Sequence, residues 1–302
     1  KPSPPSPLLP ERLALIRLAS KAAWGRELPI SPVQENGATD GVYFRNAGIP
    51  VYGVTGIAMP VGEERMHGKD ERIPAKSFRE GVAFATALIA NTAGGRKVTT
   101  KRVDVSKRTE ARGFVASALR DFDRVDILVN NAGLGWAGRL VEMPEDKARA
   151  LVDTNILGVV WTAQAALEAM VAAGSGVVIN VSSIAGVRAT PYSALYSATK
   201  HAVTGLSHAL RGELSGTGVK VCAVYPAVTG SEFFTVSGGH QVGPVYPASW
   251  VANLIVRTAR FPRRDAMVFP FRLAHFAEPF LGGLIDHAVG EVRRKAEPEI
   301  SK

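Results

Sequence analysis

From about residue 49 onward, short apolar runs alternate with segments whose apolar residues recur every three or four positions. A continuous run such as Val177–Val181 predicts a strand buried on both faces, and the three- to four-residue period predicts a helix. The predicted strands are 51–55, 97–103, 125–129, 177–181, 219–225 and 266–269, and the predicted helices are 11–24, 77–92, 108–122, 145–172, 192–214 and 248–260. Strands that alternate with helices form a parallel sheet with helices on both faces. We therefore predict an α/β fold.

The two ends of the chain depart from this pattern. Residues 1–10 contain five prolines, so we expect an extended or disordered leader there. We divide the chain into an N-terminal extension at 1–48, a domain at 49–270 and a helical tail at 271–302. The tail is expected to pack on the core or on a second subunit, with peripheral contact with a membrane as the alternative.

Composition excludes several classes of function. The 302 residues are 46% hydrophobic, which is enough for a substantial core, and the one cysteine, Cys222, excludes an internal disulfide. None of the six histidines has metal-ligand spacing, so no metal is predicted. The net charge is +9, but no basic run is interleaved with aromatic residues, so no nucleic-acid partner is predicted. The sequence has neither an apolar stretch of membrane-spanning length nor a secretory signal, so we expect a cytoplasmic protein. The missing initiator methionine is consistent with a fragment or a processed form.

Candidate chemistry centres on Tyr196, Lys200 and Ser183. Residues four apart share one face of a helix, so Lys200 lies one turn beyond Tyr196. A free tyrosine has a pKa near ~10, and a neighbouring cation favours its charged form, so we expect Lys200 to lower the pKa of Tyr196. A lone tyrosine–lysine pair is more often a surface pair, but this one is accompanied by other polar groups at strand ends.

Those polar groups each follow a predicted strand or interrupt a predicted helix. Asn130-Asn131-Ala132-Gly133 follows a buried strand, and its small residues let a ligand approach the backbone. Asp104 is placed either to accept a hydrogen bond from an adenine amino group or to cap the helix that begins near Lys107. Asn155 lies within an apolar helix, where it either has a special role or bonds locally. Parallel sheets bind ligands at the carboxyl ends of their strands, which is where these groups fall.

Taken in order, these motifs resemble the short-chain dehydrogenase/reductase family over residues 93–270. The resemblance is carried by Asp104-Val105, Asn130-Asn131-Ala132-Gly133, Asn155, Ser182-Ser183, Tyr196-Ser-Ala-Thr-Lys200 and Pro226–Phe233. It implies a Rossmann-type, doubly wound parallel sheet in three layers (α/β/α). It also implies NAD or NADP as cofactor, and hydride transfer between the nicotinamide and a carbonyl or alcohol carbon.

The resemblance also assigns roles to residues. Tyr196 matches the catalytic acid/base. Lys200 matches the residue that binds the nicotinamide ribose and lowers the pKa of the tyrosine. Ser183, rather than Ser182, matches the residue that hydrogen-bonds the substrate oxygen. Asn155 matches the position that distorts its helix and anchors a water. The implied cofactor-binding residues are Gly56, Gly62, Asp104, Val105, Asn131, Ala132, Gly133, Tyr196, Lys200, Pro226 and Thr229.

The glycine-rich turn departs from the family pattern. In Thr55–Gly62 a proline, Pro60, stands where the family has its middle glycine, and it removes a backbone donor that could face pyrophosphate. Three interpretations remain open: a tolerated variant, a loss of cofactor affinity, or an error in the sequence of residues 1–80. Lys76 and Arg79 favour NADP if they face a 2′-phosphate; as solvated charges they carry no preference.

Two functions follow as hypotheses. The leading one is an NAD(P)-dependent oxidoreductase for an apolar alcohol or ketone, with Leu134, Trp136, Phe233 and Phe234 in the substrate region. The alternative, motivated by Pro60, is a non-catalytic binding or scaffold protein on the same fold. The resemblance further implies a homodimer or homotetramer formed through the two long helices.

Overall fold

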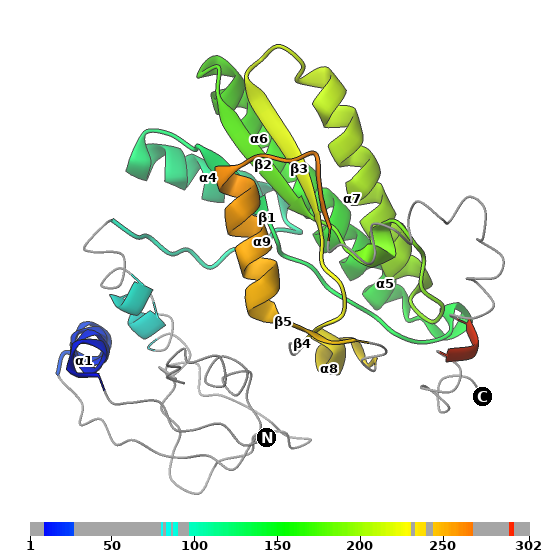
Figure 1. Cartoon of the computed structure of the whole chain (residues 1–302), viewed down its shortest axis with the longest axis horizontal. Helices are drawn as coiled ribbons and strands as arrows, with labels where there is room; N and C mark the ends of the chain where they lie inside the picture. Colours follow the sequence, from blue (N-terminus) through cyan, green and yellow to red (C-terminus); the bar gives the residue numbers. More distant parts are fainter. Residues whose placement is uncertain are drawn as a thin grey trace, which may run out of the picture. The chain divides into compact units, whose positions relative to one another are not determined.

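The computed structural model describes residues 9–26, 80, 83–85, 87–89, 97–230, 233–239, 244–267 and 290–292 (Figure 1). The chain divides into two compact units, Lys1–Arg102 and Val103–Lys302. In the first unit, α1 (Pro10–Trp24) begins with proline at its first position and ends at Gly25, whose φ of 71° is the left-handed conformation that glycine adopts readily. The Trp24 ring lies 5.6 Å from that of Phe84, measured between centroids. The predicted strand 51–55 lies outside the described residues.

The second unit is built on a four-stranded parallel sheet in the order β1-β2-β3-β6. Its strands are β1 (Ile127–Asn130), β2 (Gly176–Val181), β3 (Val219–Tyr225) and β6 (Asp265–Met267). A short parallel pair, β4 (Thr229–Gly230) and β5 (Tyr246–Pro247), lies apart from it. In register, Asn130 pairs with Asn180, and Val181 with Val224, so the carboxyl ends of the first three strands meet at one edge.

Helices cover both faces of this sheet. The chain runs through α4 (Arg108–Phe122), α5 (Glu145–Val152), α6 (Gly158–Ala172), α7 (Ala194–Glu213), α8 (Phe233–Ser237) and α9 (Ala248–Arg260) (Figure 1). Successive side chains of a strand point to opposite faces. Accordingly Val178 of β2 packs with α4 and α6, whereas Ile179 packs in a second cluster with Leu254 and Ile255 of α9. The prediction of a three-layer α/β/α arrangement is confirmed.

One continuous helical segment, Glu145–Ala172, is long and apolar enough to cross a membrane by length and composition. Within the described residues it is the one segment of this kind. Ala166 and Met170, at 0% and 1% exposure, lie in the core beside the sheet. The apolar character of this segment is therefore used in packing the fold.

Most element boundaries agree with the sequence pattern, and two do not. The helices Arg108–Phe122 and Ala248–Arg260 and the strand Val219–Tyr225 were predicted with these bounds. The predicted helix 192–214 begins only at Ala194, because Tyr192 has a φ of 61°, which is incompatible with a right-handed helix. The predicted strand 97–103 is wrong, because the structure describes all of these residues and forms no strand among them. Alternation of polar and apolar residues supplies a strand pattern but not the partner that a strand needs.

Candidate active site

A cavity of about 740 Å³ opens beyond the carboxyl ends of β1, β2 and β3. Each strand contributes to its lining through the residues that follow it: Asn131 and Gly133 after β1, Ser183 after β2, and Pro226 and Thr229 after β3. Helix α7 supplies Tyr196 and Lys200 to the same lining. The structure thus brings together in one cavity residues that the sequence spreads over about a hundred positions.

Ser183 and Ser182 have different environments although they are adjacent. Ser183 is extended (φ −169°, ψ 163°), lines the cavity and hydrogen-bonds the phenol of Tyr196; its oxygen also accepts from the Ala185 amide at 3.1 Å. The Ser182 side chain is 2% exposed and donates to the Lys200 carbonyl at 2.9 Å. The hydroxyl that is directed to Tyr196 is therefore that of Ser183, as the thirteen-residue spacing predicts.

Lys200 is held away from solvent. It is 6% exposed, and its Nζ donates to the Val181 carbonyl at 2.9 Å and lies 5.8 Å from the centroid of the Tyr196 ring. Burial disfavours the charged ammonium and lowers the pKa of Lys200 to about 8. At neutral pH the amine still carries its proton.

Burial also controls Tyr196. It raises the pKa of the phenol above its ordinary value, and the hydrogen bond with Ser183 acts in the opposite direction without reversing the shift. The net pKa of Tyr196 is therefore raised in the protein chain alone, where we expected Lys200 to lower it. The physical reason is that burial removes the phenolate from water, which outweighs the hydrogen bond with Ser183. In this state Tyr196 is a proton donor.

Asn155 fastens the loop after β1 to the helices. It lies at the centre of a five-residue π-helical turn, Asp153–Leu157, that joins α5 to α6. Its Oδ1 accepts from the Leu134 amide at 2.8 Å, and its Nδ2 donates to the Leu134 carbonyl at 2.9 Å and to Thr199 Oγ1 at 3.0 Å. The helix is distorted at the position that the family resemblance indicated. The side chain bonds to a distant loop rather than locally.

Two predicted cofactor residues lie elsewhere. Asp104 accepts from the Ser106 amide at 3.1 Å and from the Ser106 hydroxyl at 2.6 Å, and these bonds lower its pKa. It forms a turn before α4, and the cap position itself is occupied by Lys107. Val105 packs against α6 closely enough that a Cβ on Gly158 would lie 3.0 Å from its side chain. Neither residue lines the cavity, nor does Ala132, and Gly56 and Gly62 lie outside the described residues.

Much of the remaining wall of the cavity is apolar. The ring of Phe233 lies 5.5 Å from that of Tyr196 and 5.7 Å from that of Phe234, and Trp136 lines the same space. Helix α8 is held to the loop after β1 by a 2.9 Å hydrogen bond from the Ala137 amide to the Ser237 carbonyl. A Cβ on Gly135 would lie 2.5 Å from the Phe233 ring, so this contact requires glycine.

Sequence reasoning missed two contributions to the site. Val251 and Ile255 of α9 line the cavity, although α9 was predicted only as a covering helix. Thr199, with 0% exposure, accepts from Asn155 and donates to the Tyr196 carbonyl at 2.8 Å. Its position three residues after Tyr196 was the signal that could have identified it.

Comparison with known proteins agrees with this geometry. The profile of the family described as short chain dehydrogenase matches residues 67–240. An uncharacterized oxidoreductase of Methylorubrum extorquens is 33% identical over 208 residues, which is 68% of this chain and 81% of the relative. The chain belongs to the short-chain dehydrogenase family. It is accordingly an oxidoreductase by family, with the Rossmann-type fold.

Other proteins match over shorter stretches or by fold. An uncharacterized NAD-dependent oxidoreductase of Mycobacterium tuberculosis is 40% identical over 136 residues, covering 44% of this chain and about half (49%) of the relative. The alcohol dehydrogenase of Thermococcus sibiricus, solved with 5-hydroxy-NADP, has a TM-score of 0.55 at 26% identity, covering 64% of this chain and 82% of that one. A short-chain dehydrogenase of Sphingobium yanoikuyae, solved with NADPH, has a TM-score of 0.58 at 25% identity, covering 68% and 82%.

Proposed function

We propose that this short-chain dehydrogenase transfers a hydride between NAD(P) and a carbonyl or alcohol carbon, with Tyr196 as the catalytic acid/base. The observation that carries the proposal is the meeting of Ser183, Tyr196 and Lys200 in one cavity at the carboxyl edge of the sheet. Open α/β sheets bind ligands in this place. The raised pKa of Tyr196 keeps the phenol protonated at neutral pH, as the acid of a carbonyl reduction must be.

The protein groups have complementary tasks. When a carbonyl is reduced, negative charge develops on its oxygen, and groups that donate hydrogen bonds to that oxygen lower the barrier. Tyr196 would donate its proton to the oxygen, and Ser183, which already hydrogen-bonds the phenol, would hold the oxygen in place. The Lys200 ammonium would stabilise the phenolate that remains. The nicotinamide, when bound, supplies or accepts the hydride.

Part of the predicted cofactor-binding set fits a dinucleotide. Five of the predicted cofactor-binding residues line the cavity together: Asn131, Gly133, Lys200, Pro226 and Thr229. Gly133 leaves room beside Lys200, because a Cβ atom on residue 133 would lie 3.5 Å from Lys200 Nζ. These residues, with Tyr196, would hold the nicotinamide half. The phosphate and adenosine half is assigned from the sequence alone to Gly56, Gly62, Asp104, Val105 and Ala132.

NADP is the cofactor that we favour. Lys76 and Arg79 are suited to a 2′-phosphate, and both solved relatives compared above carry NADP-type ligands. The Mycobacterium tuberculosis relative is named NAD-dependent, so the choice calls for measurement. Comparing kcat/KM for NADPH and NADH on one substrate decides it; a higher value for NADH would reverse this assignment.

The substrate is proposed to be an apolar ketone or secondary alcohol. Trp136, Phe233, Phe234, Val251 and Ile255 all line the cavity, and the Phe233 ring lies beside that of Tyr196, so much of the wall is apolar. Apolar walls with a few convergent polar groups are typical of sites for small organic ligands. A panel of ketones of increasing apolar size, assayed by cofactor absorbance, would test the assignment.

Assembly and location are further parts of the proposal. We assign a homodimer or homotetramer formed through α6 and α7, supported by Val171 of α6, which is 42% exposed and lines a surface hollow together with Leu206 and Leu210 of α7. Light scattering during size-exclusion chromatography measures the mass, and a monomer at micromolar concentration would contradict it. We assign the protein to the cytoplasm, which cell fractionation tests.

The decisive experiment replaces Tyr196 with phenylalanine. The ring and its contact with Phe233 remain, but the transferable proton is lost, so we expect kcat to fall by about 10³-fold or more with folding retained. Fluorescence titration with NADPH and NADH distinguishes the enzyme from a non-catalytic binding protein on this fold. Micromolar affinity supports the enzyme; turnover by Tyr196→Phe at the parent rate would show the mechanism to be wrong.

A further inference from the structure

A row of polar side chains runs along α7 beyond the site. Lys200, Thr204 and Arg211 lie four and then seven residues apart, which places them on one face of the helix. Each bonds to β2, to β3 or to the residue that follows β2. The partners are the Val181 carbonyl for Lys200 Nζ (2.9 Å), Ser182 Oγ for Thr204 Oγ1 (3.1 Å) and the Val221 carbonyl for Arg211 Nε (3.0 Å). Directional bonds at three levels restrict sliding of α7 along the sheet.

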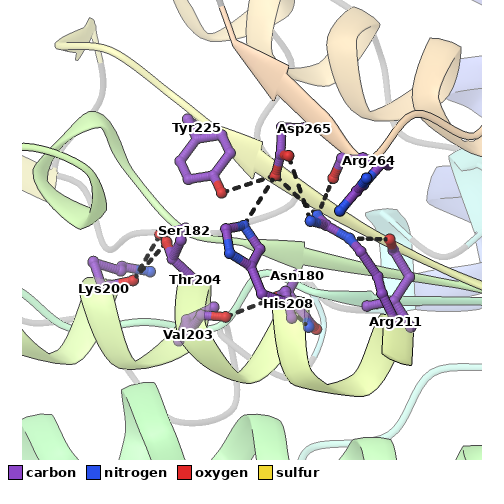
Figure 2. Close-up of polar contacts among 12 residues, drawn as sticks. Asn180, Ser182, Lys200, Val203, Thr204, His208, Arg211, Tyr225, Arg264 and Asp265 are labelled. Carbon is purple, nitrogen blue, oxygen red and sulfur yellow. Dashed lines mark hydrogen bonds and ion pairs between the residues drawn. The ribbon is translucent and has the colours of Figure 1, made fainter. Parts of the chain in front are cut away.

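The row ends on a carboxylate that joins three elements. Asp265 of β6 accepts at Oδ1 from the Tyr225 hydroxyl of β3 at 3.0 Å and from Arg211 Nη2 of α7 at 2.9 Å (Figure 2). His208 Nε2 lies 3.5 Å from the same oxygen. Burial acts to raise the pKa of Asp265, but the bonds and charge of Arg211 bring it below its usual value, so the group is a carboxylate at neutral pH.

A chain of hydrogen bonds thus runs from Tyr225 of β3 through Asp265 to Arg211 of α7. Tyr225 is 2% exposed, and its hydroxyl donates to Asp265 Oδ1 at 3.0 Å. A carboxylate only accepts, so Asp265 fixes the direction of this bond. Closer to the site, Ser182 Oγ and Thr204 Oγ1 both donate to the Lys200 carbonyl, at 2.9 Å and 3.1 Å.

The backbone beside Tyr225 holds the backbone beside Ser183. The Ser182 amide donates to the Val224 carbonyl at 2.8 Å, and the Ile184 amide donates to the Pro226 carbonyl at 2.9 Å. Ser183 is thus bracketed by bonds to the two neighbours of Tyr225. A displacement of Tyr225 is transmitted to the segment that carries the Ser183 hydroxyl.

We propose that Tyr225 and Asp265 are positioning residues, which lock α7 to the carboxyl ends of β2 and β3 and so set the spacing between the Ser183 and Tyr196 hydroxyls. Neither lines the cavity, so neither touches substrate. The consequence for catalysis rests on the function proposed above, whereas the positioning itself does not. A catalytic constellation displaced by about 1 Å can lose on the order of a hundredfold in rate.

The first experiment is independent of turnover. Tyr225→Phe removes one hydroxyl but keeps the ring that fills the core, and amide hydrogen exchange of the full-length chain is followed at Ile184. Ser207→Ala is the matched control: Ser207 has 0% exposure, lies on α7 and accepts from Asn180 at 2.9 Å, outside the chain to Tyr225. We expect Ile184 to exchange about tenfold faster in Tyr225→Phe and to be unchanged in the control. Unchanged exchange in Tyr225→Phe, or an equal increase in both variants, would overturn the positioning role.

The second experiment measures steady-state kinetics with the best ketone and cofactor. We expect Tyr225→Phe and Asp265→Ala each to lower kcat about tenfold, with KM and cofactor affinity within twofold of the parent. Asp265→Asn, which keeps an accepting oxygen for Tyr225, should recover most of kcat. The double variant should lose no more than either single one, because both changes break one chain.

Additive losses, a parent-like kcat in Tyr225→Phe, or a similar loss in Ser207→Ala would each overturn the proposal. An error in the proposed function would give a different experimental result. A parent protein that neither binds NAD(P)H nor turns over ketones contradicts the function, and the exchange rates at Ile184 then decide the positioning role by themselves.

Discussion

The two sides of the cavity are held in place by different forces. On one side Ser183, Tyr196 and Lys200 belong to segments tied to the sheet by buried hydrogen bonds, such as those of Lys200 to Val181 and Ser182 to Lys200. On the other side α8 and α9 present Phe233, Phe234 and aliphatic side chains that make mainly van der Waals contacts. Hydrogen bonds fix direction and distance, whereas apolar contacts chiefly require volume. We therefore expect the polar side to set the chemistry and the apolar side to set the choice of substrate.

After Tyr196→Phe, the largest expected effect comes from removing the buried cation on the polar side. Lys200→Met keeps the length and apolar stem of the side chain but loses the charge, so we expect kcat to fall by about a hundredfold. It also yields a stability prediction. The pKa of Lys200 is about 8 in the folded protein and ~10.4 in an unfolded chain, so between these values the unfolded state binds more protons.

The sign of the pH dependence follows from this difference in bound protons. The free energy of unfolding of the parent should rise relative to that of Lys200→Met as the pH increases from 7.5 to 10.5, by about 3 kcal/mol. Urea denaturation of both proteins at several pH values measures the difference. A difference that is constant over this range would show that Lys200 is not desolvated.

A smaller effect on stability and kcat is expected for Asn155, which holds the loop after β1 on the polar side. Asn155→Ala leaves the amide and carbonyl of Leu134 without the partners they have now, which should cost about 2 kcal/mol of unfolding free energy and lower kcat. Asn253→Ala, at an exposed position on α9, is the matched control and should change stability by less than about 0.5 kcal/mol. Equal losses of unfolding free energy in the two variants would show that the hydrogen bonds of Asn155 do not stabilise the loop.

The smallest effect is expected on the apolar side. Phe234→Ala enlarges the cavity without removing a hydrogen bond, so kcat/KM for a bulky apolar ketone should change by about tenfold, mainly through KM. The change for a small ketone should stay within about twofold. Phe114→Ala, at a 40% exposed position on α4, controls for the loss of a phenylalanine. A fall in kcat for every ketone would remove the distinction between the two sides.

The spacing of residues along one helix predicted the pairing of Tyr196 with Lys200 in the site, but contacts between separate segments could not be predicted. Tyr196 and Lys200 lie one turn apart because α-helical geometry is local, and both line the cavity. The lining by Val251 and Ile255 could not be predicted, since nothing in the pattern of α9 shows which strand ends it faces. Asp104 and Val105 do not line the cavity, because a motif gives residue types and the path of the chain decides where they lie; their role beside the adenine stays a prediction.

The sequence by itself determined the periods of the strands and helices, the parallel arrangement of the sheet, and the set of polar residues that gather at its carboxyl edge. These are local properties or follow from the order of the elements. Only the tertiary structure decided that the pKa of Tyr196 is raised and that Tyr225 and Asp265 are joined to the site. Desolvation depends on atoms supplied by remote segments, and a hydrogen bond between residues 40 positions apart has no trace in the pattern of either segment.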